Sequence, residues 1–413
     1  MSTITSWLPI PAHSDFSIHN LPWGIFSTPT LSPRVGVAIG EQVMDMNAVA
    51  ELGLLSEFKL DKEVFLSEFL NELISLGKPI TTGIRLKLQQ LLSDEDSPLK
   101  NQPSVFHSQV DVQLHLPVKI GDYTDFYSSL EHATNVGKMF RDPENALLPN
   151  WKHLPVGYHG RASSIIPSGV DIHRPKGQTK PADGSPIYGP SQRMDFELEM
   201  GFIIGKQTKL GQSLSTAEAE DYIFGMVLFN DWSARDIQKW EYIPLGPFLG
   251  KNFASSISPW IVPLEALEHA RVDGPTQDPK VLSYLDYEGQ QNYDISLSVA
   301  LQAEGKEENI ICRSNFKYMY WNMVQQLAHH TVNGCNVNVG DLMASGTISG
   351  KTPDSFGSML ELSWSGKKPL TLSDGSERTF LEDHDTIIIR GHTGEGNNRV
   401  GFGEIRTKLL PSL

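Results

Sequence analysis

Acidic residues at short spacing are the first feature of this sequence that could perform chemistry. Residues 193–204 alternate polar and apolar side chains, so in a strand Asp195, Glu197 and Glu199 would share one face. Same-face neighbours lie only about 7 Å apart, and like charges that close need water or a cation to neutralise them. This segment alone is compatible with a solvated strand face or a metal site, and it slightly favours the solvated face.

A second polar group follows residues 223–230, an apolar run typical of a buried strand. Ser233 and Asp236 resemble a capping pattern, so we expect a helix to begin there with Asp231 at its positive end. Three side chains would then share one helix face and suit an anionic ligand: Arg235, Gln238 and Tyr242. The alternative is an exposed amphipathic face.

Lys251 and His132 are the remaining candidates. Lys251 lies in an otherwise apolar loop, where a buried lysine would need acidic partners; a loop lysine in water is an equal alternative. Ser128 and Glu131 form a capping-box pattern that places His132 in the first turns of a helix. A histidine held there can act as a general base if a partner fixes its tautomer, although an incidental surface histidine is the alternative.

The elements that must position these residues divide the chain near residue 117. Before it, residues 34–40 resemble a strand, and residues 65–74 and 84–92 have helical spacing on either side of Gly77-Lys78-Pro79. After it, glycine and proline become frequent and the expected strands are short, with a helix predicted over 315–332. We therefore predict an α+β, mostly β protein with an N-terminal domain over 1–117 and a catalytic domain over 118–413.

Composition excludes several functional classes. The 413 residues are 39% hydrophobic and 20% charged, which is a globular profile. Neither an apolar run long enough to span a bilayer nor a secretory signal at the N-terminus is evident, and Cys312 and Cys335 are too few for a disulfide framework or a zinc cluster. With 34 basic against 49 acidic residues the net charge is −15, which repels nucleic acid. We expect a cytoplasmic protein without a membrane or nucleic-acid partner.

Six segments, in the same order along the chain, resemble those of the fumarylacetoacetase family. They are residues 123–137, 155–161, 195–199, 230–236, 346–350 and 355–362. The resemblance implies an N-terminal SH3-like barrel and a larger C-terminal mixed β-roll. It also implies a homodimer that uses Ca²⁺ and Mg²⁺ to hydrolyse 4-fumarylacetoacetate, a small diketo acid, to fumarate and acetoacetate. This reaction is the last step of tyrosine and phenylalanine (homogentisate) catabolism.

The same resemblance assigns site residues. The catalytic cation would be held by Asp125, Glu197, Glu199 and Asp231, and a second cation would lie near Asp231, Lys251 and Ser255. The family commonly has Gly-Thr where this chain has Ala254-Ser255, which keeps the hydroxyl. His132, oriented by Glu361, would be the general base, and the oxyanion would be stabilised by Arg235, Gln238 and Lys251. The substrate would be held by Tyr127, Arg141, Tyr158, Gln238, Tyr242 and Thr347. An all-carboxylate site favours a hard cation.

Two rival functions follow from the same residues. An acylpyruvate hydrolase or a decarboxylase of diketo acids would share the carboxylates, but such enzymes are usually shorter and lack the N-terminal domain. A Ca²⁺-stabilised binding module would explain the carboxylates but not His132, Arg235, Gln238 and Lys251. The glycine-rich residues 391–396 lack phosphate-loop spacing and predict a tight turn.

Overall fold

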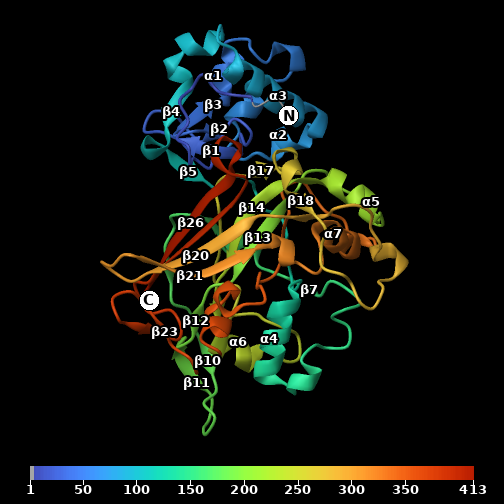
Figure 1. Ribbon diagram of the computed structural model, residues 1–413, viewed down its shortest axis with the longest axis vertical. Coiled ribbons are helices and arrows are strands. Elements are labelled where there is room, and N and C mark those ends of the chain that lie inside the picture. Colours follow the sequence, from blue (N-terminus) through green and yellow to red (C-terminus); the bar gives the residue numbers. More distant parts are fainter. Residues whose placement is uncertain (1–3) are drawn as a thin grey trace.

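The computed structural model describes residues 4–413, so part of the N-terminus in which we found no signal pattern (residues 1–3) lies outside it. The N-terminal part is a small antiparallel sheet with helices around it, at the top of Figure 1. Its strands, in the spatial order β4-β3-β2-β1-β5, are β1 (Trp23–Ser27), β2 (Arg34–Ile39), β3 (Gln42–Asp45), β4 (Phe106–Ser108) and β5 (Gln113–His115). The strand expected at residues 34–40 is therefore confirmed.

Three α-helices accompany this sheet: α1 (Met46–Glu51), α2 (Asn71–Ser75) and α3 (Lys78–Ser93). The single helical stretch predicted over 65–74 is wrong, because a 3₁₀ turn ends at Leu66 and the extended Ser67 separates it from α2. The expected break at Gly77-Lys78-Pro79 is confirmed. Gly77 adopts a left-handed φ of 88°, and Pro79 lies in the first turn of α3, where its missing N–H is not needed.

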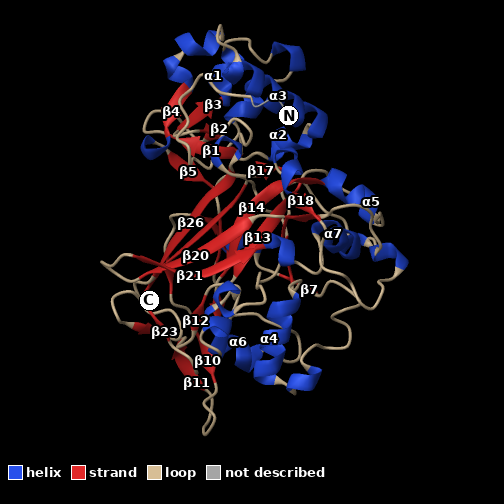
Figure 2. Ribbon diagram, in the orientation of Figure 1, coloured by secondary structure: helices blue, strands red, loops and turns tan. Residues whose placement is uncertain are grey.

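A mixed eight-stranded sheet forms one layer of the C-terminal part (Figure 2). Its path is β7 (Gly157–His159), β6 (Tyr123–Phe126), β22 (Leu342–Ala344), β13 (Leu198–Ile204), β14 (Ile223–Asp231), β16 (Ser255–Ile257) and β8 (Ile165–Pro167), with β17 (Val262–Pro263) also on β14. The pairs β6–β22 and β16–β8 are parallel. Every residue of β14 is buried, as its unbroken apolar run predicted.

A five-stranded sheet packs against β14. Its order is β21 (Glu308–Asn315), β20 (Ser296–Gln302), β25 (Thr386–Thr393), β26 (Val400–Leu410) and β9 (Ile172–His173). Strand β14 contacts both β25 and β26. The approach is so close that a Cβ on Gly391 would lie 2.8 Å from the Leu228 side chain. Leu228, Val299 and Phe402 are fully buried in the core between these layers. The mostly β character with some helices is confirmed.

Short helices and hairpins surround the two sheets (Figure 1). The helices are α4 (Leu130–Phe140), α5 (Thr216–Ala219), α6 (Arg235–Glu241), α7 (Met323–Thr331) and α8 (Met359–Leu362). The small strand pairs are β10 (Lys176–Thr179) with β11 (Ile187–Pro190), β12 (Met194–Asp195) with β15 (Ser233–Ala234), β18 (Arg271–Val272) with β19 (Asn292–Tyr293), and β23 (Leu370–Thr371) with β24 (Glu377–Arg378). Across residues 4–413, no helix has the length and apolarity needed to cross a membrane.

Two local predictions in this part are corrected or confirmed. The helix expected over 315–332 is shorter, because Asn315 ends β21 and the helix starts only where Asn322 and Gln325 form a reciprocal capping box. The tight turn predicted over the glycine-rich residues 391–396 is confirmed only in its second half: residues 391–393 end β25, and the turn follows, with left-handed φ at Gly394 and Gly396.

Candidate active site

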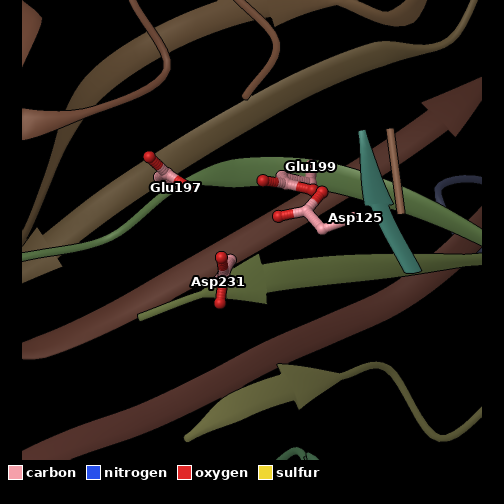
Figure 3. A group of neighbouring side chains, drawn as sticks. All are labelled: Asp125, Glu197, Glu199 and Asp231. Atoms are coloured by element: carbon pink, nitrogen blue, oxygen red, sulfur yellow. The ribbon is translucent and has the colours of Figure 1, made fainter. Parts of the chain in front are cut away.

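Carboxylates from different strands of the eight-stranded sheet converge on one buried point (Figure 3). Asp125 comes from β6, Glu199 from β13 and Asp231 from the end of β14, while Glu197 lies just before β13. One ligand oxygen from each lies within 4.8 Å of the others. The sequence-based grouping of Asp125, Glu197, Glu199 and Asp231 is what the structure brings together.

An interruption of the acidic strand brings Glu197 to this point. Instead of one strand over 193–204, β12 ends at Asp195 and β13 begins at Leu198. Between them the Glu197 N–H donates to the side-chain oxygen of Asn230, on the neighbouring strand β14, at 3.0 Å rather than to a backbone carbonyl. The solvated face, one of the two alternatives for this segment, is therefore excluded, because Glu197 and Glu199 are both buried.

Lys251 neutralises one half of the cluster. Its ammonium group donates to Glu197 Oε2 and, at 2.6 Å, to Asp231 Oδ2, and the side chain is only 7% exposed. Burial alone lowers the pKa of Lys251, but the charges of Asp231 and Glu197 raise it above its ordinary value. Lys251 is therefore protonated, and a protonated amine has no lone pair for a metal. Its side chain serves here as a counter-ion, not as a ligand.

The guanidinium of Arg235 adds a second positive charge on the same side of the cluster. Its Nε donates to Asp195 Oδ2 and one terminal nitrogen donates to Glu197 Oε1, both at 2.7 Å. The other terminal nitrogen is buried and has no hydrogen-bond partner among residues 4–413. Burial alone would raise the pKa of Glu197, but the charges of Lys251, Arg235 and His132 lower it. Glu197 is therefore an anion, and Arg235 keeps one donor that a substrate oxygen can use.

The other half of the cluster fits a cation. Asp125 and Glu199 have no ion pair within the described chain, and one oxygen of each is buried without a hydrogen-bond partner. Burial, followed by the charge of Asp231, raises the pKa of Asp125 well above its usual range; burial and the charge of Asp125 do the same for Glu199. Repelling, underbonded carboxylate oxygens are the donor set that a hard divalent cation takes.

His132 and Glu361 form a hydrogen-bonded pair beside the cluster. His132 Nδ1 lies 2.6 Å from Glu361 Oε2, and both side chains are buried. Burial alone would raise the pKa of Glu361, but the charge of His132 and the hydrogen bond between the two side chains lower it. An anionic Glu361 favours the tautomer with a proton on Nδ1, which leaves Nε2 free to accept another proton.

Helix starts near the site differ from their predictions by one or more residues. His132 does lie in the first turn of α4, but the side chain that accepts its N–H is Ser129, at 3.2 Å, and not Ser128. The capping pattern from Ser233 to Asp236 is wrong, because Ser233 belongs to β15 and α6 begins at Arg235 without a side-chain cap.

Comparison with known proteins identifies the family. Residues 19–117 match the family model described as fumarylacetoacetase N-terminal, and residues 122–409 match the one described as fumarylacetoacetate (FAA) hydrolase C-terminal. This chain belongs to the fumarylacetoacetate hydrolase family. The fumarylacetoacetase of Rattus norvegicus is 53% identical over 415 residues, that of Homo sapiens 52% over 415, each covering 99% of both chains. That of Arabidopsis thaliana is 49% identical over 421 residues and covers 100% of both.

Solved structures share the fold of this chain at low sequence identity. A fumarylacetoacetate hydrolase from the psychrophile Exiguobacterium antarcticum superposes with a TM-score of 0.53 and 18% identity, covering 95% of this chain and 99% of its own. A maleylpyruvate hydrolase from Sphingobium sp. SYK-6 superposes with a TM-score of 0.52 and 15% identity, covering 95% of this chain and 100% of its own. At such identities the likeness shows the fold alone.

The remaining residues predicted from the family resemblance fall into two groups. Tyr158 donates to Asp231 Oδ2 at 2.9 Å, Ser255 donates to Asp231 Oδ1 at 3.1 Å, and the Tyr127 ring lies edge-on to the His132 ring at 5.3 Å. Gln238 Oε1 lies 3.5 Å from Arg235. Thr347 is buried and follows Gly346, whose N–H donates to Glu199 at 3.0 Å.

Arg141 and Tyr242 lie farther from the cluster's polar network. The Arg141 guanidinium is exposed and donates to the carbonyl of Ala146, at 2.8 and 3.1 Å. Tyr242 directly follows α6 and is 48% exposed. Their assignment to substrate binding stays a prediction.

Sequence reasoning missed the side chains that hold Glu361. Besides His132, Glu361 accepts hydrogen bonds from Asn135 at 2.9 Å, Ser349 at 2.9 Å and Ser358 at 3.0 Å. Asn135 was detectable, because it stands three residues after His132 and therefore shares its helix face. Ser349 and Ser358 belong to loops and carry no such signal.

Proposed function

We propose that this chain hydrolyses the carbon–carbon bond of 4-fumarylacetoacetate to give fumarate and acetoacetate, the last step of tyrosine and phenylalanine catabolism. The observation that carries the proposal is the buried His132–Glu361 pair beside the four carboxylates, in a chain that is about half identical to curated fumarylacetoacetases over its whole length. A module that only binds a cation would have no use for a general base held in this way.

The proposed reaction uses the chain's own residues as follows. His132 Nε2 accepts a proton from water, and the remaining hydroxide adds to the carbonyl carbon next to the bond that breaks. Arg235, Gln238 and Lys251 stabilise the negative charge that develops on the carbonyl oxygen. The carbon–carbon bond then breaks with its electron pair on the departing fragment, an enolate, and protonated His132 returns the proton to form acetoacetate. Glu361 stabilises the imidazolium between these two steps.

The unpartnered nitrogen of Arg235 supports its role toward the substrate. A guanidinium whose other nitrogens are fixed on Asp195 and Glu197 cannot turn away, so the two N–H bonds of its unpartnered nitrogen point in set directions. Tyr127, Tyr158 and Thr347 complete the proposed substrate site, together with Arg141 as a carboxylate clamp and Tyr242 at its edge.

We assign the catalytic cation to Asp125, Glu197, Glu199 and Asp231, and we propose that it is Ca²⁺. Ca²⁺ held by these carboxylates would supply Lewis acidity toward a carbonyl of the diketo acid. A second cation, Mg²⁺, is proposed near Asp231, Lys251 and Ser255, where Asp231 and Ser255 offer oxygens.

The other features implied by the family are part of the same proposal. They are the SH3-like form of residues 1–117, the β-roll form of residues 118–413, a cytoplasmic location and a homodimer. The two cysteines are free thiols, which supports a reducing compartment. Exposed apolar side chains at Ile243, Leu245 and Phe248 offer a surface that a second copy would cover; light scattering of the purified chain measures the mass that decides this.

A spectrophotometric assay tests the proposed function. Purified protein supplied with Ca²⁺ is given fumarylacetoacetate, acetylpyruvate or a decarboxylatable diketo acid at equal concentration. We expect the highest kcat/KM for fumarylacetoacetate, with fumarate and acetoacetate as the only products. Preference for acetylpyruvate would replace the proposal with acylpyruvate hydrolysis, and binding without turnover of any of them would leave only a binding module.

A further inference from the structure

Asp195 is the one buried acidic residue beside the cluster that neither ligates nor reacts in the proposed mechanism. It is fully buried and lies on β12, where it pairs with Ser233 of β15. Burying a carboxylate is unfavourable unless hydrogen bonds and an opposite charge compensate, so the partners of Asp195 show what it stabilises.

The partners of Asp195 belong to two separate parts of the site. Its Oδ2 accepts from the Nε of Arg235 at 2.7 Å. Its Oδ1 accepts from the N–H of Met359 at 2.6 Å, and Oδ2 also accepts from the N–H of Leu360 at 3.0 Å. Met359 and Leu360 are the first two residues of α8, the helical turn that carries Glu361.

Asp195 provides hydrogen-bond acceptors for the start of α8. The first N–H groups of any helix have no partner inside it. Here Asp195 accepts two of them, and the Ser358 hydroxyl accepts the N–H of Glu361 at 3.3 Å. A helix of four residues has little stability of its own, so these bonds, together with the burial of Met359 and Leu360 in the core, hold Glu361 in place.

We propose that Asp195 is a positioning residue that fixes the oxyanion-stabilising Arg235 and the Glu361–His132 pair to one another. It acts through both and touches no reacting atom. The inference rests on the proposed hydrolase function, because it assigns Asp195 a role in that reaction. It explains why a charge is buried where an apolar residue would serve packing alone.

Asp195→Asn is the informative substitution because it preserves shape and removes one acceptor. An asparagine offers one carbonyl oxygen, while its NH₂ group can only donate. With the oxygen in the Oδ2 position, Arg235 and Leu360 keep their acceptor, and the NH₂ opposes the N–H of Met359. With the amide reversed, Met359 keeps its acceptor, and the NH₂ group faces the two donors Arg235 Nε and the Leu360 N–H. Either orientation displaces α8 or Arg235.

The matched control is Asp385→Asn. Asp385 is 2% exposed and also accepts from an arginine, Arg378, at 2.9 and 3.1 Å, and from a backbone N–H, that of Glu382, at 2.8 Å. It contacts none of the site residues through these bonds. Any general effect of neutralising a buried, arginine-paired aspartate therefore appears in both variants.

Steady-state kinetics and proton NMR of the Ca²⁺-supplied full chain test the proposal. We expect kcat of D195N to fall about 100-fold, the cost of a displacement of about 1 Å at a catalytic group, with KM little changed. The low-field resonance of the His132 Nδ1 proton, assigned by its loss in H132N, should shift or broaden in D195N and stay in place in D385N.

Failure of this inference differs from failure of the proposed function. If the wild-type chain does not hydrolyse fumarylacetoacetate, the function is wrong. If it does, and D195N keeps kcat within threefold of wild type or leaves the His132 resonance unchanged, the positioning role is overturned. A D195N protein that fails to fold where D385N folds would also overturn it, because Asp195 would then determine the fold and not the site.

Discussion

Replacing Lys251 by methionine should destabilise the metal-free protein strongly, although it removes only one ammonium group. Methionine nearly matches the lysine stem in length, so packing changes little. What changes is the charge compensation of Glu197 and Asp231, which are buried and both bonded to Lys251. Removing one partner of a buried ion pair costs about 3–5 kcal/mol, because the other charge is left uncompensated.

The remaining contacts place K251M at the lower end of that range. Glu197 keeps its bond to Arg235, and Asp231 keeps the hydroxyls of Tyr158 and Ser255. We therefore expect the free energy of unfolding to fall by about 3 kcal/mol. Urea unfolding followed by circular dichroism, in the presence of a chelator, measures the change.

A double mutant isolates the charge pair. In K251M/D231N the second uncompensated charge is also removed, so the double variant should be more stable than K251M by about 1–2 kcal/mol. Lys87→Met is the control, because within residues 4–413 Lys87 forms its one ion pair with the exposed Glu57, at 3.3 Å; this substitution should cost less than about 1 kcal/mol. A loss below about 1 kcal/mol in K251M would refute the view that Lys251 is the counter-ion of the cluster.

Three further outcomes test the site and its surroundings. His132→Ala should lower turnover by about 10²–10⁴-fold while Ca²⁺ binding, followed calorimetrically, is retained; near-normal turnover in H132A would contradict the role of His132 as base. Glu361→Gln should lose less turnover, because an amide oxygen can still accept a hydrogen bond from His132. Chelation should abolish activity, and added Ca²⁺ should restore it. Glu199→Gln should raise the Tm of the metal-free protein, because it relieves repulsion between carboxylates, and it should remove the further rise in Tm that Ca²⁺ gives the wild type. An unchanged response of the Tm to Ca²⁺ would refute the assignment of Glu199 as a ligand. Burial, followed by the charge of His159, lowers the pKa of His330 from 6.5 to about 4, so as the pH falls the unfolded chain binds a proton at His330 before the folded chain does. The free energy of unfolding should therefore fall by about 2–3 kcal/mol from pH 6.5 towards pH 4. In urea titrations His330→Gln should flatten this pH dependence, and an unaltered pH dependence would contradict the lowered pKa.

The family resemblance predicted which carboxylates meet in the acidic cluster, and three of the four also stand in segments with a signal of their own. Asp231 ends an unbroken apolar strand, and Glu197 and Glu199 alternate with apolar residues at strand spacing. The alternation of polar and apolar residues could not reveal the break in the strand at Phe196–Glu197, because this break depends on a hydrogen bond to the Asn230 side chain on another strand. Asp195 looked like a third member of the same acidic face for that reason, and its separate role was invisible.

Helix caps were predicted less well than the acidic cluster, because several neighbouring residues can satisfy the same capping pattern. Ser128 and Ser129 stand side by side, and only the structure shows that Ser129 accepts the His132 N–H while Ser128 accepts from Gln326. Ser233 and Asp236 match a cap in spacing, but pairing with Met194 and Asp195 keeps Ser233 and Ala234 extended. Tertiary pairing of this kind overrides local preference.

The parallel pairing of β6 with β22 has a consequence for how activity is acquired. It places Asp125 beside Ala344, and the neighbouring N–H of Asp122 donates to Asp341, 219 residues along the chain. Contacts between such distant segments form late in folding, because the entropy cost of closing a long loop must be met before these contacts can stabilise the structure. During synthesis the carboxylates therefore stay apart until most of the chain has emerged. Refolded protein should recover helical circular dichroism before it recovers cation binding or turnover.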